Sequence, residues 1–541
     1  MNEYVNNSVT FWRSDSLPEH AYDYAENEQL CVFLSGIAVL ANGEKTPCQN
    51  LLEIAQAAVD GSLNYNNLHG YYRMVVYDKV HSKHLFWGDN SGSQFFFVDW
   101  QNNLFSDRFL TLVEQRSGAL KPCCEAVMQI INDRVFTNET VVAEITKTDP
   151  EMVYEYQNGV CAAHSKALQP LCQRNGIRLD RLMEMLTQKT SDCETGAVCT
   201  GGTDSRAILA HLYKRKKKPK LLITGHPDNP DVGVARKIAE ELKLPLTVIA
   251  PADREEAWLD KAFQFSDGLY DTVLSYRHMQ IQKWAQENGI RFLYGGVGGE
   301  FYKNFFCQPF RNKTFRRPVS GEKLFNLLMK SRLQVPAWGG KALTEARDTL
   351  QKKARAFAEN CAEPGNVLFG FNRLGFSVLR YKAGMMTHAY AGTCTRIDPL
   401  MNRDVVAAAS QIPPVKLSMH LWQRKEIRKW CPALGNLPTD QGYSCSMNPI
   451  RIFLEQCKKL SVYGKAAWKK VLRKIGFKNK PKAQYWDRDY NEAKNAPAFA
   501  HGLQICKDLG IARGDAETNK IPPKDVGLII MLGYLFGDSK N

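Results

Sequence analysis

Several common motifs are missing from this chain, and each absence excludes a class of protein. No GxxxxGKS/T is present, which excludes a Walker-type phosphate loop, and no GxGxxG opens a strand–helix unit. The fifteen cysteines form no CxxC pair and no metal-finger spacing, so they fit thiols kept reduced in a cytosol. The first residues form no apolar leader, and the longest apolar stretch, 526–537, is too short to span a bilayer and predicts a buried terminal helix. We therefore expect a cytoplasmic protein.

Composition and length are those of a globular protein with more than one domain. Hydrophobic residues make up 44% of the chain, and 541 residues are too many for one core, so two or three domains are expected. The formal net charge of +15 permits a polyanion, a membrane surface or an acidic peptide as partner without selecting one.

The order of the expected elements predicts an α/β fold. Short aromatic and β-branched runs separated by turn residues over 69–107 predict an antiparallel meander. From about residue 190, strand-like runs alternate with helical patterns such as 231–242 and 274–288, which predicts a parallel sheet wound with helices. The strands expected there are 197–199, 221–224, 246–249 and 292–294. Beyond about residue 320 the pattern is mostly helical.

A glycine-rich turn joins the first of these strands to a helix, in 196-GAVCTGGTDSRAILAHL-212. Gly201 and Gly202 let the backbone come close to a ligand, and the amides and dipole of the helix N-terminus favour an anion. The Ser205 hydroxyl can hold pyrophosphate oxygens, and Asp204 can hold Mg²⁺. The alternative is a tight turn with a helix cap and no ligand.

A second glycine-rich turn follows a later strand, in 294-YGGVGGEFYKN-304. Two such turns after strands of one parallel sheet lie at its carboxyl edge, where ligands bind. Glu300 then stands where it can complete a metal site with Asp204, or it is a surface carboxylate at a helix start.

TGGTDSR followed by GGVGGE resembles the ATP-pyrophosphatase domain of the asparagine synthetase superfamily, whose turns run SGGxDS and GxGxDE or GGxGGE. That superfamily includes asparagine synthetase, β-lactam and carbapenam synthetases and lasso-peptide macrolactam synthetases. Segments 224–246, 399–417 and 425–444 are similar to later parts of that domain, and GYYRMVVYDKVHSKHLFWGDNSGSQFFFV, residues 70–98, is similar to the glutaminase-like front domain. The resemblance covers roughly residues 30–540.

The resemblance implies a fold and a reaction. Residues 1–165 would form a glutaminase-like domain of the αββα N-terminal-nucleophile hydrolase type. Residues 166–541 would form a parallel-sheet ATP-pyrophosphatase domain of the PP-loop, adenine nucleotide α-hydrolase type, with a helical C-terminal part. Such enzymes bind ATP and Mg²⁺, transfer AMP to a carboxylate, release pyrophosphate, and let an amine attack the acyl-adenylate to form an amide.

The resemblance also implies roles for individual residues. Asp204 and Glu300 would carry Mg²⁺, and main-chain groups near Leu222 and Thr224 would meet adenine. The residues that would hold ATP and its pyrophosphate are Thr200, Gly201, Gly202, Thr203, Asp204, Ser205 and Gly296.

Glutamine-using members of the family begin with a nucleophilic cysteine. Here Met1 is followed by Asn2, and the first cysteine, Cys31, lies inside a strand-like run. The front domain is therefore expected to be a scaffold, and glutamine is not expected to donate nitrogen. This favours the β-lactam or lasso type, in which the amine belongs to the substrate.

A second departure is at the glutamate with which the family positions the amine. Here that glutamate is replaced by Cys394 or Thr395, which leaves Asp398 as a candidate base, with Tyr381 and His388 as alternatives.

The family's late lysine, which meets pyrophosphate, falls at about Asp440. We expect Lys425 to supply that cation, with Arg424 and Arg428 as alternatives.

The expected function is an ATP-dependent, AMP-forming amide synthetase acting on a small molecule or peptide that carries a carboxylate and an amine. The product is a lactam, a macrolactam or an intermolecular amide. One alternative is a degenerate scaffold that binds nucleotide without catalysis. Another is a thiolation or nucleotide-modifying enzyme, but the glutaminase-like front end argues against it, and a nucleic-acid partner is not expected.

Between Lys458 and Lys482 the sequence holds many basic residues and no acidic ones, with Leu460, Tyr463, Ala467, Val471 and Ile475 at helical spacing. An acidic peptide or a membrane surface would suit this segment. The alternative is a helix docked on the core with a solvated basic face.

Overall fold

The fold is described from a computed structural model. The described residues are 4–6, 9–11, 22–41, 47–171, 176–250, 254, 257–303, 305, 320–362, 367–390, 393–440, 442–455, 457 and 487–537. The basic segment 458–482 lies outside them.

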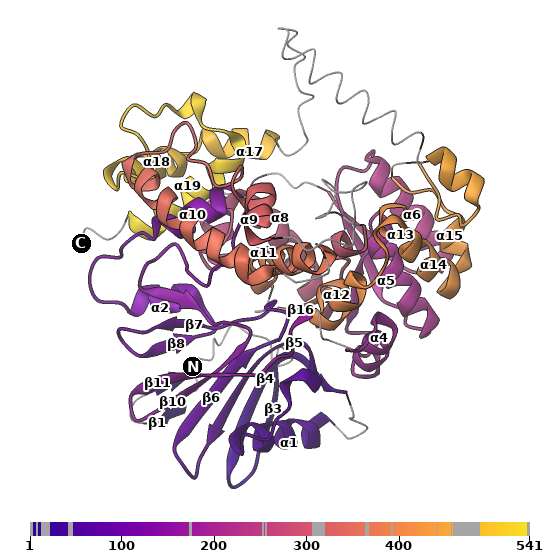
Figure 1. The fold of residues 1–541 in the computed structure, drawn as a ribbon, viewed down its shortest axis with the longest axis horizontal. Helices are drawn as coiled ribbons and strands as arrows, with labels where there is room; N and C mark the ends of the chain where they lie inside the picture. Colours follow the sequence, from indigo (N-terminus) through magenta and orange to yellow (C-terminus); the bar gives the residue numbers. More distant parts are fainter. Residues whose placement is uncertain are drawn as a thin grey trace.

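The N-terminal part of the chain contains a six-stranded antiparallel sheet with the order β11-β10-β6-β5-β4-β3 (Figure 1). Its strands are β3 (Tyr22–Glu26), β4 (Leu30–Leu40), β5 (Leu68–Asp78), β6 (Lys83–Gly88), β10 (Met152–Gln157) and β11 (Val160–Ser165). A smaller sheet has the order β8-β7-β9, from β7 (Phe97–Asp99), β8 (Leu104–Ser106) and β9 (Ile145–Lys147), and β1 (Tyr4–Asn6) pairs with β2 (Val9–Phe11). Helices α1 (Pro47–Val59), α2 (Phe109–Gln115) and α3 (Cys124–Ile131) accompany these sheets.

The meander predicted over 69–107 is therefore correct for the antiparallel pairs β5–β6 and β7–β8 but wrong in placing the two pairs in one sheet. The chain leaves the large sheet after β6, and β7 and β8 pair in the smaller one. Buried Asp89 forms the junction, because its carboxylate accepts the backbone amides of Ser91 at 2.8 Å and Gln94 at 2.7 Å. A local turn that a carboxylate stabilises redirects the strand, and period-two patterning alone does not reveal it.

The second half of the chain contains a five-stranded sheet with the order β14-β13-β12-β15-β16, in which every pairing is parallel. Its strands are β12 (Thr195–Val198), β13 (Lys220–Thr224), β14 (Leu246–Ile249), β15 (Phe292–Tyr294) and β16 (Thr395–Ile397). The predicted α/β class with a parallel sheet is confirmed. The sequence pattern missed β16, which has three residues and falls in the region expected to be helical.

Helices cover both faces of the parallel sheet. Leu222 of β13 packs with Trp284 on one face, whereas Ile223 points to the opposite face and lies in the same core cluster as Ala207 and Ala235. Trp284 belongs to α8 (Thr272–Glu287), Ala207 to α5 (Thr203–Lys214) and Ala235 to α6 (Pro230–Leu242). Successive strand residues alternate between faces, so one short apolar strand is buried on both sides.

The remaining helices are mostly C-terminal, as predicted. They are α4 (Leu179–Gln188), α7 (Trp258–Phe265), α9 (Gly321–Leu324), α10 (Lys341–Cys361), α11 (Val367–His388), α12 (Arg403–Ser410), α13 (Pro414–Ser418), α14 (Leu421–Trp430), α15 (Pro432–Asn436), α17 (Asp487–Lys494), α18 (Pro497–Asp508) and α19 (Pro523–Phe536). Helix α19 is buried along most of its length, as expected of the apolar stretch 526–537. No helix within the described residues is long and apolar enough to cross a membrane.

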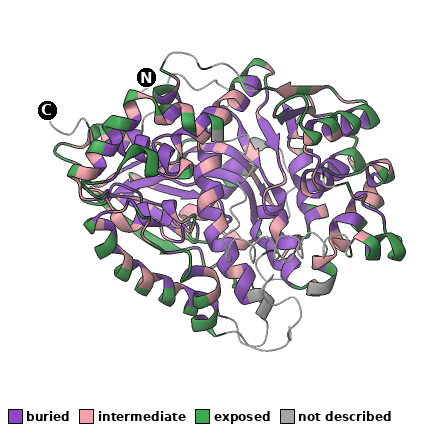
Figure 2. Ribbon diagram, turned by 90° about the horizontal axis from the view of Figure 1, so that it is seen from above, coloured by how far each residue is buried: buried purple, intermediate pink, exposed green. Residues whose placement is uncertain are grey.

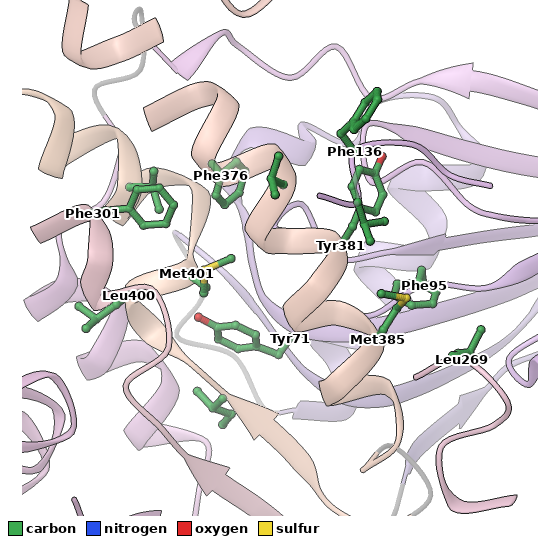
Figure 3. Close-up of a cluster of buried hydrophobic side chains, with 14 of the residues drawn as sticks. Tyr71, Phe95, Phe136, Leu269, Phe301, Phe376, Tyr381, Met385, Leu400 and Met401 are labelled. Atoms are coloured by element: carbon green, nitrogen blue, oxygen red, sulfur yellow. The ribbon is translucent and has the colours of Figure 1, made fainter. Parts of the chain in front are cut away.

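Helix α11 lies between the antiparallel and parallel parts. Figure 3 shows Phe301 and Met401 on one side of it and Phe95 and Phe136 on the other. The Tyr71 hydroxyl of β5 donates to the backbone carbonyl of Asp398 at 2.8 Å, which joins the two parts directly. Buried residues run through the middle of the molecule, while exposed ones lie on the outer helix faces (Figure 2). The antiparallel part therefore supports the carboxyl edge of the parallel sheet.

Candidate functional site

The first glycine-rich turn lies between β12 and the N-terminus of α5, as the sequence predicts. Gly202 is the helix N-cap, and Thr203 and Asp204 open the first turn. The hydroxyls of Thr200 and Ser205 lie 2.7 Å apart, and the Thr200 amide donates to Ser205 Oγ at 3.3 Å. The turn thus gathers two hydroxyls at the positive end of a helix, which is an arrangement suited to phosphate oxygens.

Two charged residues that sequence reasoning missed hold the shape of this turn. The Gly201 amide donates to the carboxylate of Asp231, in the first turn of α6. The fully buried guanidinium of Arg206 donates to the Gly201 carbonyl at 3.2 Å. The same guanidinium donates to the carbonyls of Leu437 at 2.7 Å and Pro438 at 2.9 Å. A segment more than two hundred residues away in sequence therefore closes over the turn.

The second glycine-rich turn packs directly on the first. A Cβ atom on Gly296 would stand 2.6 Å from the backbone nitrogen of Ser205. A Cβ atom on Gly299 would stand between 2.0 and 2.4 Å from the carboxyl atoms of Asp204. Both positions require glycine because the neighbouring atoms are backbone or a held carboxylate. The contact confirms that the two turns meet at one edge of the sheet.

The second turn runs into a short 3-10 helix, η4 (Gly299–Lys303), and aromatic packing fixes the position of this helix. Phe301 packs edge-on against Phe376 of α11, with ring centroids 6.2 Å apart. Tyr302 stacks on Trp422 at 3.8 Å and donates its hydroxyl to the Val405 carbonyl at 2.7 Å. With both aromatic side chains buried, Glu300 is held close to Asp204.

Asp204 and Glu300 are near enough for the charge of one to act on the other. Burial raises the pKa of Glu300, and the charge of Asp204 raises it further, while Lys303 acts in the opposite direction. Lys303 Nζ lies 2.5 Å from one Asp204 oxygen, and the Gln423 amide lies 3.4 Å from the other. Two carboxylates brought together in this way repel each other, and a divalent cation would remove that repulsion.

The two carboxylates fit Mg²⁺ only if further ligands come from elsewhere. Within the described residues, no group of three histidine, cysteine or acidic side chains could hold a metal. Mg²⁺ commonly uses one or two carboxylates together with waters and substrate phosphates. Asp204 and Glu300 therefore match a metal that arrives with a phosphorylated ligand.

The lysine at this site is Lys303, which sequence reasoning did not single out. Lys425 is exposed on α14, two residues from Gln423, and residues two apart on a helix point in nearly opposite directions. Since Gln423 reaches Asp204, Lys425 points away from it. The sequence signal for Lys303 is its position three residues after Glu300, one helical turn on.

The alternative cations are engaged elsewhere. Arg424 is buried and donates to the carbonyls of Ser444 at 2.9 Å and Ser446 at 2.8 Å. Arg428 donates to the side chain of Asn436 at 3.2 Å. The Asp440 side chain is exposed, while its amide donates to the Gly201 carbonyl at 3.3 Å. Of these cations, Lys303 is the one that contacts Asp204, and the role of Lys425 at pyrophosphate stays a prediction.

The candidate bases lie in different places. Asp398 is buried and paired with Arg396 at 3.1 Å, and it accepts the Val297 amide of the second turn at 3.1 Å. Tyr381 and His388 lie farther along α11, where Tyr381 donates to Asn138 and His388 lies 3.2 Å from Asp267. Asp398 is thus the candidate that touches a glycine-rich turn.

A polar pair that the sequence did not indicate adjoins Arg396. His278 Nδ1 of α8 lies 2.5 Å from the Tyr390 hydroxyl. Burial lowers the pKa of His278 to about 4, and the charges of Arg396 and Arg277 lower it further. The imidazole is therefore neutral at physiological pH, and its surroundings disfavour its protonated form.

The residues expected at adenine lie at the same edge of the sheet. Leu222 is buried in β13 and its carbonyl accepts the Cys199 amide at 2.8 Å, whereas Thr224 is exposed at the end of the strand. Thr224 is thus the more accessible of the two.

Cys31 lies within β4, buried and paired with Glu26 of β3. Burial also raises the pKa of its thiol. Neither feature suits a nucleophile at a chain terminus.

The chain was also compared with known proteins. No family model matches it, and no curated protein matches it.

Proposed function

We propose that this protein is an ATP-dependent amide synthetase that forms AMP and pyrophosphate. It would join a carboxylate to an amine without glutamine as nitrogen donor, to give a lactam, a macrolactam or an intermolecular amide. In this proposal the antiparallel part is a degenerate glutaminase-like domain, residues 1–165, and residues 166–541 are a PP-loop synthetase domain similar to those of the asparagine synthetase superfamily.

One observation carries the proposal: the contact between the two glycine-rich turns. It brings together the hydroxyls of Thr200 and Ser205, the carboxylates of Asp204 and Glu300, and the ammonium of Lys303. Phosphate oxygens need donors and cations, and Mg²⁺ needs carboxylates. A nucleoside triphosphate with its metal meets all of these groups at once.

The chemistry follows from these groups. A substrate carboxylate oxygen attacks the α-phosphorus of ATP, the bond from that phosphorus to the bridging oxygen breaks, and pyrophosphate leaves. The amine nitrogen then attacks the acyl carbon, the bond to the AMP oxygen breaks, and the amine proton passes to a base. The donors of the first turn and Lys303 would stabilise the charge that develops on pyrophosphate. Bound Mg²⁺ would neutralise phosphate charge.

Two residues are candidates for the base. Asp398 touches the second turn, but Arg396 holds its carboxylate in an ion pair. His278 lies near the same arginine and is neutral, but its pKa, lowered to about 4 by burial and by two arginine charges, makes it a weak base. If Asp398 stays paired with Arg396, its role would be to position the second turn through the Val297 amide. The proposal leaves the residue that accepts the amine proton open.

The proposal that glutamine is not used rests on β4. Cys31 lies in the interior of a strand that is paired on both sides, with β3 and with β5. Exposing Cys31 as a terminal residue would remove β3 and uncover the edge of the sheet, which is costly. The proposal therefore assigns the nitrogen to an amine of the substrate.

The experiment follows ATP labelled at the α-phosphate, incubated with the protein, Mg²⁺ and an extract of small molecules and peptides from the source cells. We expect labelled AMP that depends on the extract and disappears with Asp204→Ala. Labelled ADP would contradict the mechanism. ATP binding without turnover, also in fractionated extract, would favour the alternative of a nucleotide-binding scaffold.

A further inference from the structure

Both oxygens of the Asp204 carboxylate already have a donor in this structure. Lys303 Nζ lies 2.5 Å from one oxygen, and the side-chain amide of Gln423 lies 3.4 Å from the other. The neighbouring carboxylate of Glu300 accepts the backbone amide of Gly298 at 3.1 Å. Donors of the chain itself therefore engage the two carboxylates to which a cation would bind.

These donors differ in how firmly they are held. The Gln423 side chain is fully buried on α14, and the backbone of Gly299 lies so close to Asp204 that a Cβ there would stand 2.0 to 2.4 Å from the carboxyl atoms. The Lys303 side chain is 29% exposed at the end of η4, and its four-carbon stem is flexible. The ammonium group can thus move away from Asp204 without disturbing the packing.

The charge of Lys303 acts on both carboxylates. Burial and the charge of Asp204 raise the pKa of Glu300, and the charge of Lys303 lowers it. A free divalent cation that approached the pair would meet this ammonium group beside the same oxygen, and like charges repel strongly where water is partly excluded. Lys303 therefore takes part of the place that a metal charge would have.

A triphosphate changes this balance. Its anionic oxygens are strong acceptors for a lysine ammonium group, which binds phosphate as a point charge. When Lys303 turns to a phosphate oxygen, Asp204 loses its closest donor, and the two carboxylates again need a positive charge. The metal ion that accompanies the triphosphate supplies it.

We propose that Lys303 determines the specificity of this site: it keeps free divalent cations out and releases Asp204 only when a triphosphate draws its ammonium group away. The inference rests on the nucleotide binding of the proposed function. It adds that the site binds metal and nucleotide together and does not bind the metal alone.

The test measures Mn²⁺ retained by the full-length protein in equilibrium dialysis, because Mn²⁺ uses the same oxygen ligands as Mg²⁺. Without nucleotide, the wild type should retain little Mn²⁺. With α,β-methylene-ATP, which cannot release pyrophosphate, its affinity should rise at least about tenfold. Lys303→Met should bind Mn²⁺ without nucleotide at least about tenfold more tightly than the wild type, because the competing charge is gone.

Two further variants locate the effect. Lys382→Met is the matched control, since Lys382 is 34% exposed and pairs with Asp133 at 2.7 Å, and it should bind Mn²⁺ no better than the wild type. Lys303→Met/Asp204→Asn should lose the gained affinity. Lys303→Gln repeats the test with a polar side chain, and circular dichroism checks that each variant is folded.

Two outcomes would overturn the proposal. One is a wild-type protein that binds Mn²⁺ without nucleotide as tightly as Lys303→Met. The other is a folded Lys303→Met or Lys303→Gln protein that gains no affinity for Mn²⁺. Neither depends on turnover, so the result is separate from that of the labelled-ATP experiment. AMP formation without the gain in Lys303→Met would leave the synthetase proposal standing, whereas the gain without AMP formation would leave only this inference.

Discussion

Asp89 in the antiparallel part and Glu300 at the edge of the parallel sheet are both acidic groups whose burial raises their pKa, to about 7 for Asp89. Their surroundings differ. Asp89 accepts backbone amides from Ser91, Ser93 and Gln94 and lies near the charge of Lys166. Glu300 accepts an amide from Gly298 at 3.1 Å and lies within reach of the negative charge of Asp204.

The comparison separates a buried charge that the fold itself satisfies from one that the proposed function assigns to a ligand. The protein itself satisfies Asp89, so removing that carboxylate should unfold part of the structure. The Asp204–Glu300 pair is only partly compensated by Lys303, so removing Asp204 should cost function more than stability. Sites arranged for a ligand commonly carry this kind of cost.

The largest expected effect is that of Asp204→Ala. AMP formation should fall at least about 1000-fold, because the metal and the leaving group lose their support. The free energy of unfolding should change by no more than about 1 kcal/mol, since the repulsion with Glu300 and the partly exposed ion pair with Lys303 disappear together. Asp89→Ala should do the reverse and lower the free energy of unfolding by about 3 kcal/mol, from amides left without an acceptor. Labelled ATP and urea unfolding measure the two effects, and a large stability loss in Asp204→Ala would break the comparison.

Gly299→Ala tests the contact between the two turns. Its Cβ would enter the space of the Asp204 carboxylate, so we expect loss of about 1–3 kcal/mol of stability together with loss of ATP binding. Gly233→Ala in α6 is the matched control, because a Cβ there meets nothing within 4 Å. That substitution should be neutral or stabilise by about 0.5–1 kcal/mol. Calorimetric titration with ATP and thermal unfolding distinguish the two variants. Equal ATP binding and equal stability in both would contradict the close contact of Gly299 with Asp204.

Lys303→Met against Lys425→Met tests which cation faces the phosphates. The Lys303 variant should lose about 100-fold in kcat/KM for ATP, since one donor to the leaving group is removed. The Lys425 variant should change little, because that side chain points away from Asp204. Steady-state pyrophosphate release is the measurement. The opposite ranking would restore the sequence-based expectation for Lys425.

The smallest effect concerns two histidines, one in each region. Burial lowers the pKa of His84 in β6 and of His278 in α8 to about 4. Between pH 6.5 and 4 the unfolded chain therefore binds more protons than the folded one, and stability falls as the pH is lowered through that window. Each histidine contributes at most roughly 3 kcal/mol to this loss.

Urea unfolding at several pH values measures this dependence. His84→Gln and His278→Gln should each flatten it, whereas His226→Gln, at an exposed position, should leave it unchanged. If neither substitution changes the pH dependence of the free energy of unfolding, carboxylates alone determine the acid sensitivity.

Much of the architecture follows from the sequence. The strands at 246–249 and 292–294 are predicted to the residue, since short β-branched and aromatic runs between helical patterns are distinctive. The smaller antiparallel sheet is not predictable in this way. Its strands have only three residues, and the Asp89 turn that separates them from β6 is a side-chain effect.

The sequence predicts those parts of the candidate site that lie within a short stretch of the chain. The glycines, Asp204 and Glu300 lie in two short motifs whose spacing carries the chemistry. Gln423 and the carbonyls bound by Arg206 come from distant segments, and their roles depend on packing that no local pattern records. Lys303 belongs to the second motif, but the sequence does not show that its side chain points toward Asp204. That direction is set by the path of η4.

Arg206 has a consequence for how the protein is made. Its guanidinium orients the first turn only when the carbonyls of Leu434, Leu437 and Pro438 surround it. During translation the turn at residues 200–205 leaves the ribosome long before those carbonyls exist. The emerging chain would therefore carry a glycine loop without its final shape. If the loop holds nucleotide as proposed, binding would begin only after residue 438 has been made, and a product truncated before that point would not bind.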